Sequence, residues 1–150
     1  MKLKVLMGAG DRILLSTLPF AAIVVVSNIL TPMWFDLGLG VTGLIVGIIL
    51  LAVGVATWFA SVAMVLIWVP RKKLITSGPF AVVRHPAYVA VALLVLPGLG
   101  FLLDTWLVMA LGVVLYVFVR IFSPAEEKIL TAVFPVEYPA YRSRILLPWL

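Results

Sequence analysis

The chain of 150 residues contains no cysteine and a single histidine, and only 11% of its residues are charged. The lack of cysteine excludes disulfides, thiolate nucleophiles and zinc or iron–sulfur sites built on cysteine. One histidine argues against a histidine-rich metal site, so we expect no metal. Charged residues make up about a quarter of an ordinary soluble domain. The chain is therefore predicted to be an integral membrane protein, organised as one domain over residues 1–150.

Apolar sequence is abundant instead, at 65% of the residues. Two long apolar stretches and two shorter ones can be interpreted as helices that cross the ~30 Å hydrocarbon core. They cover residues 13–35, 41–69, 87–103 and 105–122. The predicted fold is all-α, an integral membrane helical bundle of four transmembrane helices, of which the last two form a helical hairpin before a cytoplasmic C-terminal segment.

Three features of the first two predicted helices bear on how they cross the membrane and pack. Basic residues before the first stretch would also fit a signal peptide, but its length and the lack of a small-residue cleavage site favour a retained helix, kinked at Pro19. The second helix, at about 29 residues and ~43 Å, must tilt, bend or project past the bilayer. The pairs Gly43/Gly47 and Ala56/Ala60 have the spacing that lets helices approach closely.

The basic residues predict the topology. With four spans, all eleven lysines and arginines fall at one face, and the opposite loops carry only Asp36 and Asp104. The positive-inside rule makes the basic face, and both termini, cytoplasmic. The basic positions are 2, 4, 12, 71, 72, 73, 84, 120, 128, 142 and 144. Because these cations lie between apolar spans, anionic lipid headgroups are the expected partner and nucleic acid is not.

The longest interruption of the apolar sequence runs from Leu74 to Tyr88 and holds the only histidine. Gly78-Pro79 predicts a turn, and Pro86 pushes His85 into an extended conformation and suits the first position of a helix. A helix start beside Arg84 and His85 favours an anionic ligand group. The alternative is an interface loop whose cations meet lipid phosphates.

After the fourth span, Ser123, Pro124 and Glu126 have the spacing of a capping box that starts a new helix. Glu126 would then have a structural role. The remaining tail is amphipathic and carries Tyr138 and Tyr141, and Trp149 is a candidate interface anchor.

The motifs Leu-x-Thr-Ser-Gly-Pro-Phe, Arg-His-Pro-x-Tyr, Glu-Glu-x-x-Leu and Phe-x-x-x-Tyr-x-x-Tyr follow one another between about Lys72 and Tyr141. In this order the chain resembles the isoprenylcysteine carboxyl methyltransferase family, which is related to phospholipid N-methyltransferases. The resemblance implies S-adenosylmethionine as methyl donor, bound on the cytoplasmic side between the loop before the hairpin and the segment after it.

Carried over by position, the resemblance implies a set of cofactor-binding residues on the loop, at the helix start and beyond the hairpin. They are Lys72, Lys73, Leu74, Ile75, Phe80, His85, Pro86, Ala87, Tyr88 and Glu126. Transfer from a sulfonium needs mainly alignment of the acceptor and exclusion of water, which fits a sequence without a catalytic triad or metal set. No individual catalytic residue is predicted.

The substrate-binding candidates are Arg120 and Phe122. The resemblance implies an arginine four residues before the Glu-Glu pair to hold a carboxylate, and this chain has Phe122 there with Arg120 nearest. Two positions rotate a helical side chain by roughly 200°, so Arg120 is not expected to substitute. We therefore hypothesise an acceptor other than a prenylcysteine carboxylate, such as an amine headgroup or a thiol on a lipid-soluble or lipidated carrier.

The leading interpretation is an S-adenosylmethionine-dependent membrane methyltransferase. The alternative is a non-enzymatic membrane scaffold or carrier that retains the motifs. A carrier needs ionisable groups within its spans, and these spans have almost none.

The topology can be tested with single cysteines at Lys2, Leu37, Ser77, Asp104 and Ser143. We expect a membrane-impermeant thiol reagent added from the cytoplasmic side to label positions 2, 77 and 143, but not 37 or 104, because the cations anchor one face. Cytoplasmic labelling at position 104 would contradict the hairpin.

Overall fold

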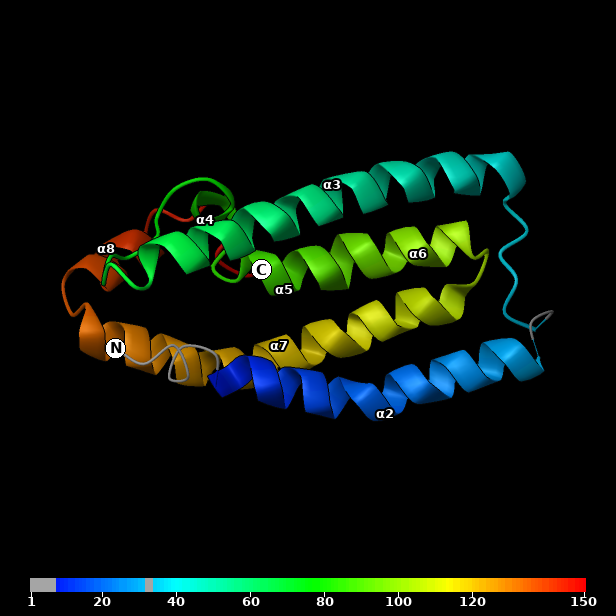
Figure 1. The fold of residues 1–150 in the computed structure, drawn as a ribbon, viewed down its shortest axis with the longest axis horizontal. Helices are drawn as coiled ribbons and strands as arrows, with labels where there is room; N and C mark the ends of the chain where they lie inside the picture. The colour runs from blue at the N-terminus through cyan, green and yellow to red at the C-terminus, as the bar shows by residue number, and fades with distance from the viewer. Residues whose placement is uncertain (1–7, 32–33) are drawn as a thin grey trace.

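The computed structural model describes residues 8–31 and 34–150, which form an elongated bundle of helices running along one axis (Figure 1). Its long helices are α2 (Gly8–Leu30), α3 (Gly40–Trp68) and α7 (Trp106–Val133). A fourth, composite helix consists of α5 (Pro86–Ala90), a π-helical turn η2 (Val91–Val95) and α6 (Leu96–Leu102). Two short helices, α4 (Pro79–Val82) and α8 (Glu137–Arg142), lie at one end.

The helices pack as a row. α2 lies against α7, α7 lies against α6 and η2, and the composite helix lies against α3 (Figure 1). The central members of the row are the composite helix and α7, so both have neighbours on two sides. The outer helices α2 and α3 expose many large apolar side chains, as expected where a helix faces lipid rather than water.

Three described helices are long and apolar enough to cross a membrane: Gly10–Leu30, Gly40–Trp68 and Trp106–Val133. The predicted second span agrees closely with α3, and Pro19 lies within α2 without ending it, as predicted. The composite helix, Pro86–Leu102, is shorter; its 17 residues measure roughly 26 Å.

The predicted end of the first span is wrong, because α2 stops at Leu30 rather than continuing to Phe35. Residues 34–39 instead join the turn between α6 and α7. Phe35 O accepts from Trp106 N at 3.1 Å, and Asp36 Oδ1 accepts from Gly38 N at 2.9 Å. The Phe35 carbonyl is therefore bonded to the start of α7, and Phe35 does not extend helix α2. The predicted basic residues Lys2 and Lys4 lie outside the described residues.

The predicted capping box is also wrong. α7 runs without interruption from Trp106 to Val133 and contains both Ser123 and Pro124. A proline inside a helix removes one hydrogen bond, and a long helix packed on both sides tolerates that loss. The residue that caps α7 is Thr105, whose Oγ1 accepts from Leu107 N at 3.4 Å.

Pro97 has a visible effect on the composite helix. It has no N–H to offer the carbonyl of Leu93, and the π-helical turn η2 lies immediately before it. The wider π turn pairs Leu96 N with Val91 O, five residues back, which re-spaces the hydrogen bonds around the proline. The helix therefore continues through Pro97.

Glycine sets the spacing of the central helices. A Cβ at Gly47 of α3 would lie 2.9 Å from the carbonyl oxygen of Gly98 in α6, so the pair Gly43/Gly47 contacts a neighbouring helix of the same chain. A Cβ at Gly112 of α7 would lie only 2.3 Å from the Ala92 oxygen. α7 and the composite helix are thus in backbone contact at Gly112.

We expect Gly112→Ala to lower the thermal unfolding midpoint clearly, with a cost at the upper end of the ~1–3 kcal/mol for overpacking, because the obstacle is backbone. Gly43→Ala is the matched control, since its Cβ would meet Leu39 Cβ at 3.0 Å and a backbone oxygen only at 3.7 Å. The measurement is thermal unfolding in detergent. Equal midpoints for the two variants would contradict the close contact.

Candidate active site

The loop between α3 and α5 begins with cations that lie over an aromatic ring. The Arg71 guanidinium carbon is 5.4 Å from the Trp68 ring centroid, and Lys73 Nζ is 5.6 Å from it. Both side chains belong to exposed residues, and Lys72 has a φ of 55°. This part of the loop is held at the end of α3 by cation–π contacts.

The second half of the loop has the turn and the helix start that its prolines predict, but His85 does not adopt the predicted extended conformation. Gly78 has a φ of 61° and precedes Pro79, the first residue of α4. His85 has φ −125° and ψ 62°, outside the helical region, and Pro86 is the first residue of α5. Pro86 is also among the most buried residues. The turn and the helix start are therefore confirmed.

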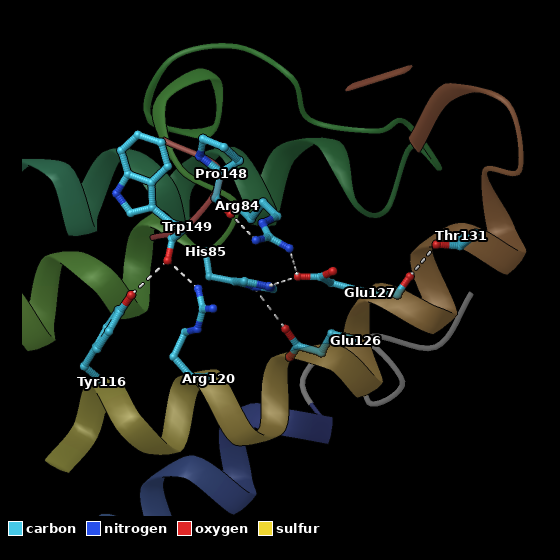
Figure 2. Close-up of polar contacts among 9 residues, drawn as sticks. All are labelled: Arg84, His85, Tyr116, Arg120, Glu126, Glu127, Thr131, Pro148 and Trp149. Atoms are coloured by element: carbon cyan, nitrogen blue, oxygen red, sulfur yellow. Dashed lines mark hydrogen bonds and ion pairs between the residues drawn. The ribbon is translucent and has the colours of Figure 1, made fainter. Parts of the chain in front are cut away.

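Arg84 and His85 reach across to a pair of carboxylates on α7 (Figure 2). Arg84 Nη1 lies 2.7 Å from Glu127 Oε1, and His85 Nδ1 lies 3.4 Å from Glu126 Oε2. His85 Nε2 is 3.7 Å from Glu127 Oε1, so the imidazole lies between both carboxylates. All four side chains are only 12–15% exposed. We call these four residues the charge cluster.

The segment 145–150 lies over the same loop. Leu146 N donates to Ala81 O at 3.2 Å, and Leu147 N donates to Val82 O at 2.9 Å. Arg84 Nη2 donates to the carbonyl of Pro148. The Trp149 carbonyl accepts from Tyr116 at 3.1 Å and from Arg120 (Figure 2). The segment thus connects the loop to α7 through main-chain carbonyls.

A buried aromatic cluster holds α8 against the loop. Tyr138, Tyr141 and Ile145 are buried together, with Leu74 packed against them. Tyr141 Oη donates to Phe80 O at 2.7 Å. Burial raises the pKa of Tyr138 and of Tyr141 to about 12. Both phenols therefore stay protonated at neutral pH, and Tyr141 keeps its donor.

A cavity of about 570 Å³ lies beside the charge cluster, within the range of small-molecule sites. One face of α7 forms much of its wall, and the loop forms the opposite side. Four cations line the cavity against one lining carboxylate, so the cavity is net positive. The lining residues are Arg84, His85, Val89, Val119, Arg120, Ser123, Pro124, Glu127, Lys128, Thr131, Arg142 and Leu150.

Of the predicted site residues, His85 and Arg120 line this cavity, and Glu126 contacts His85. Leu74, Phe80 and Tyr88 make packing or hydrogen-bond contacts with other parts of the fold. Tyr88 packs against the cluster of Ile13 and Val119. The remaining residues that are not among the cavity lining are Lys72, Lys73, Leu74, Ile75, Phe80, Pro86, Ala87 and Phe122.

Arg120 and Phe122 lie on different sides of α7, as their spacing predicts. The residue that lines the cavity is Arg120, whereas the sequence favoured position 122. Phe122 stacks on Phe118 at a centroid distance of 6.2 Å and packs against the Ile13 and Val119 cluster. Phe122 is not among the residues that line the cavity, so its role in substrate binding stays a prediction.

Glu127 is the main site residue that the sequence interpretation missed. It pairs with Arg84 and lines the cavity, whereas the implied set included only Glu126. The α7 face formed by residues 120, 123, 124, 127, 128 and 131 has helical i, i+3 and i+4 spacing. A continuous helix through Pro124 was needed to recognise this face.

A family model described as the isoprenylcysteine carboxyl methyltransferase (ICMT) family matches residues 38–132. The chain belongs to this family. The match spans α3, the loop, the composite helix and nearly all of α7, and so contains the whole charge cluster. No curated protein and no solved structure matches the chain.

Two statements about class follow. The family is one of methyltransferases, so the chain is a methyltransferase by family. Family membership and three long apolar helices together make it an integral membrane protein.

The ion pair of the charge cluster can be tested by stability. Arg84→Met should cost up to about 3 kcal/mol, because it leaves the largely buried Glu127 carboxylate without its closest cation. Adding Glu127→Gln removes that charge, so the double variant should unfold at a higher temperature than Arg84→Met alone. The exposed Arg144 provides the control Arg144→Met, with little expected effect. A double variant less stable than Arg84→Met would refute the pairing.

Proposed function

We propose that the protein transfers a methyl group from S-adenosylmethionine to a lipid-soluble or lipidated acceptor at the cytoplasmic face of the membrane. The observation that carries this proposal is the charge cluster, with Arg84 and His85 against Glu126 and Glu127, beside a net positive cavity. Family membership supplies the reaction class, and the cluster lies within the matched residues.

The residues present fit the cofactor. When bound, S-adenosylmethionine supplies an already activated methyl group. Its carboxylate would be held by the cavity's cations, Arg84, Lys128 and Arg142 among them. The carboxylates Glu126 and Glu127 suit an ammonium group or ribose hydroxyls. His85 lies between these two carboxylates and orients them.

The chain's own part in the reaction is positioning. α7, the loop and Leu150 line the cavity, and a bound acceptor would complete the exclusion of water from the reacting groups. Holding donor and acceptor in line can supply much of the rate acceleration. No residue needs to form a covalent intermediate in this proposal.

The proposed topology adds the composite helix as a fourth, short span. The turn between α6 and α7 lies at the end of the bundle opposite to α4 and α8 (Figure 1); it contains Asp104, and Asp36 pairs with Thr105 beside it. The loop cations, Arg84 and Arg142 lie at the end with the cavity. A basic end and an acidic end support a cytoplasmic cavity by the positive-inside rule. The ~26 Å helix would be accommodated by local thinning of the bilayer.

The position of Arg120 changes the proposal for the acceptor. The argument against an anionic acceptor depended on Phe122 facing the ligand, and the residue of this pair that lines the cavity is Arg120. Arg120 already donates to the carbonyl oxygen of Trp149. We therefore include an acceptor with a carboxylate oxygen among the lipidated acceptors that the cavity suits, with its apolar part in the hydrocarbon phase.

We expect His85→Ala and Glu126→Ala each to weaken S-adenosylmethionine binding by roughly 10- to 150-fold, if each removes a charge-assisted hydrogen bond worth ~1.5–3 kcal/mol. The measurement is isothermal titration of S-adenosylhomocysteine and S-adenosylmethionine into purified protein. Transfer of labelled methyl groups to membrane lipid extract and to a farnesylcysteine analogue then identifies the acceptor class.

Glu137→Ala is the control, because Glu137 is exposed on α8 and does not line the cavity. Thermal stability is measured for all variants. A wild-type protein that binds neither ligand would contradict the proposed function and favour a scaffold or carrier. Glu126→Ala that loses stability while keeping affinity would assign Glu126 a purely structural role.

A further inference from the structure

Ser123 lies at the centre of the α7 face that forms the cavity wall. It lines the cavity together with Arg120, Pro124 and Glu127. The residue is only 5% exposed, and its Oγ has no hydrogen-bond partner among the described residues. A buried hydroxyl without a partner is uncommon in folded proteins, because losing hydration without replacement is unfavourable. Its position next to a cavity indicates where a partner can come from.

Four other helical hydroxyls of the chain behave differently. Thr17, Thr57, Ser61 and Thr131 each donate to the carbonyl four residues earlier, at 2.7 to 2.8 Å. This is the ordinary solution for serine and threonine inside helices. Ser123 Oγ does not make that bond. Its hydroxyl is therefore available, as donor and as acceptor, to a molecule in the cavity.

The neighbouring residue increases the polarity of the same wall. Pro124 has no N–H, so it cannot donate to the carbonyl of Arg120 as an ordinary helical residue would. Across the cavity lies His85, whose Nε2 is 3.7 Å from Glu127 Oε1. Polar groups thus lie on two sides of the cavity, and Ser123 is the most deeply buried of the polar side chains that line it.

We propose that Ser123 is a ligand-positioning residue, whose hydroxyl hydrogen-bonds a polar group of the methyl donor bound in the cavity. This inference rests on the proposed function, which supplies S-adenosylmethionine as the occupant. Ser123 lies outside the motifs that carry the family resemblance and outside the residues implied by it. It acts through binding and takes no part in bond formation.

The test is Ser123→Ala, which removes the hydroxyl and little else. We expect S-adenosylhomocysteine to bind roughly 5- to 10-fold more weakly, the effect of losing one hydrogen bond. The unfolding midpoint without ligand should be unchanged or higher, because the variant removes a buried polar group that has no partner. In steady-state transfer, KM for the donor should rise while kcat changes little.

Ser61→Ala is the matched control. Ser61 is also a fully buried helical serine, but it donates to Thr57 O and lies in α3, away from the cavity lining. This variant should lose some stability and keep wild-type affinity for S-adenosylhomocysteine. The two serines should therefore show opposite patterns of affinity and stability.

The possible results distinguish the role of Ser123 from the proposed function of the protein. Unchanged affinity in Ser123→Ala, with a wild-type protein that binds, overturns the role of Ser123 and leaves the proposed function intact. Weaker binding that accompanies a lower midpoint without ligand overturns it too, in favour of a structural role. A wild-type protein that binds no S-adenosylhomocysteine overturns both proposals.

Discussion

The site depends on one contact, the pairing of Arg84 and His85 with Glu126 and Glu127. Charged groups this buried are tolerated only when they are paired. Because the cations are on the loop and the carboxylates on α7, satisfying them requires the loop to lie across the helix. That placement creates one side of the cavity. Arg84 also binds the Pro148 carbonyl, so segment 145–150 depends on the same residue.

Helix packing determines where the two halves of this contact can meet. α7 and the composite helix are in backbone contact at Gly112 and Ala92, and α3 approaches α6 closely at Gly47 and Gly98. These contacts fix the helices toward the end of the bundle that bears Asp36 and Asp104. At the other end the loop and α8 lie against the helix ends. The cavity lies there, next to Val89 and Val119.

Three prolines lie where the backbone of a helix begins or departs from regular hydrogen bonding. Pro86 begins α5 directly after His85, Pro97 follows the π-helical turn, and Pro124 interrupts the hydrogen bonds of α7 at the cavity wall. Pro86 takes the first position of α5, where no helical hydrogen bond is lost, whereas Pro97 and Pro124 each remove one such bond. Under the proposed function, these interruptions leave polar groups available in an otherwise apolar bundle, where they can bind a polar cofactor.

The sequence by itself determined the helical membrane class, the extent of α3, the turn at Gly78 and the helix start at Pro86, because hydropathy and proline geometry act locally. Through the family resemblance it also selected His85 and Glu126 as site residues, and the structure shows that they are in contact. Only the tertiary structure decided whether α7 is continuous and which of its side chains line the cavity. In the folded protein α7 is continuous through Ser123 and Pro124, which overrides the capping signal. Continuity then decides that Arg120, Ser123 and Glu127 share the cavity face while Phe122 faces the core, because a helical residue's direction depends on an unbroken register.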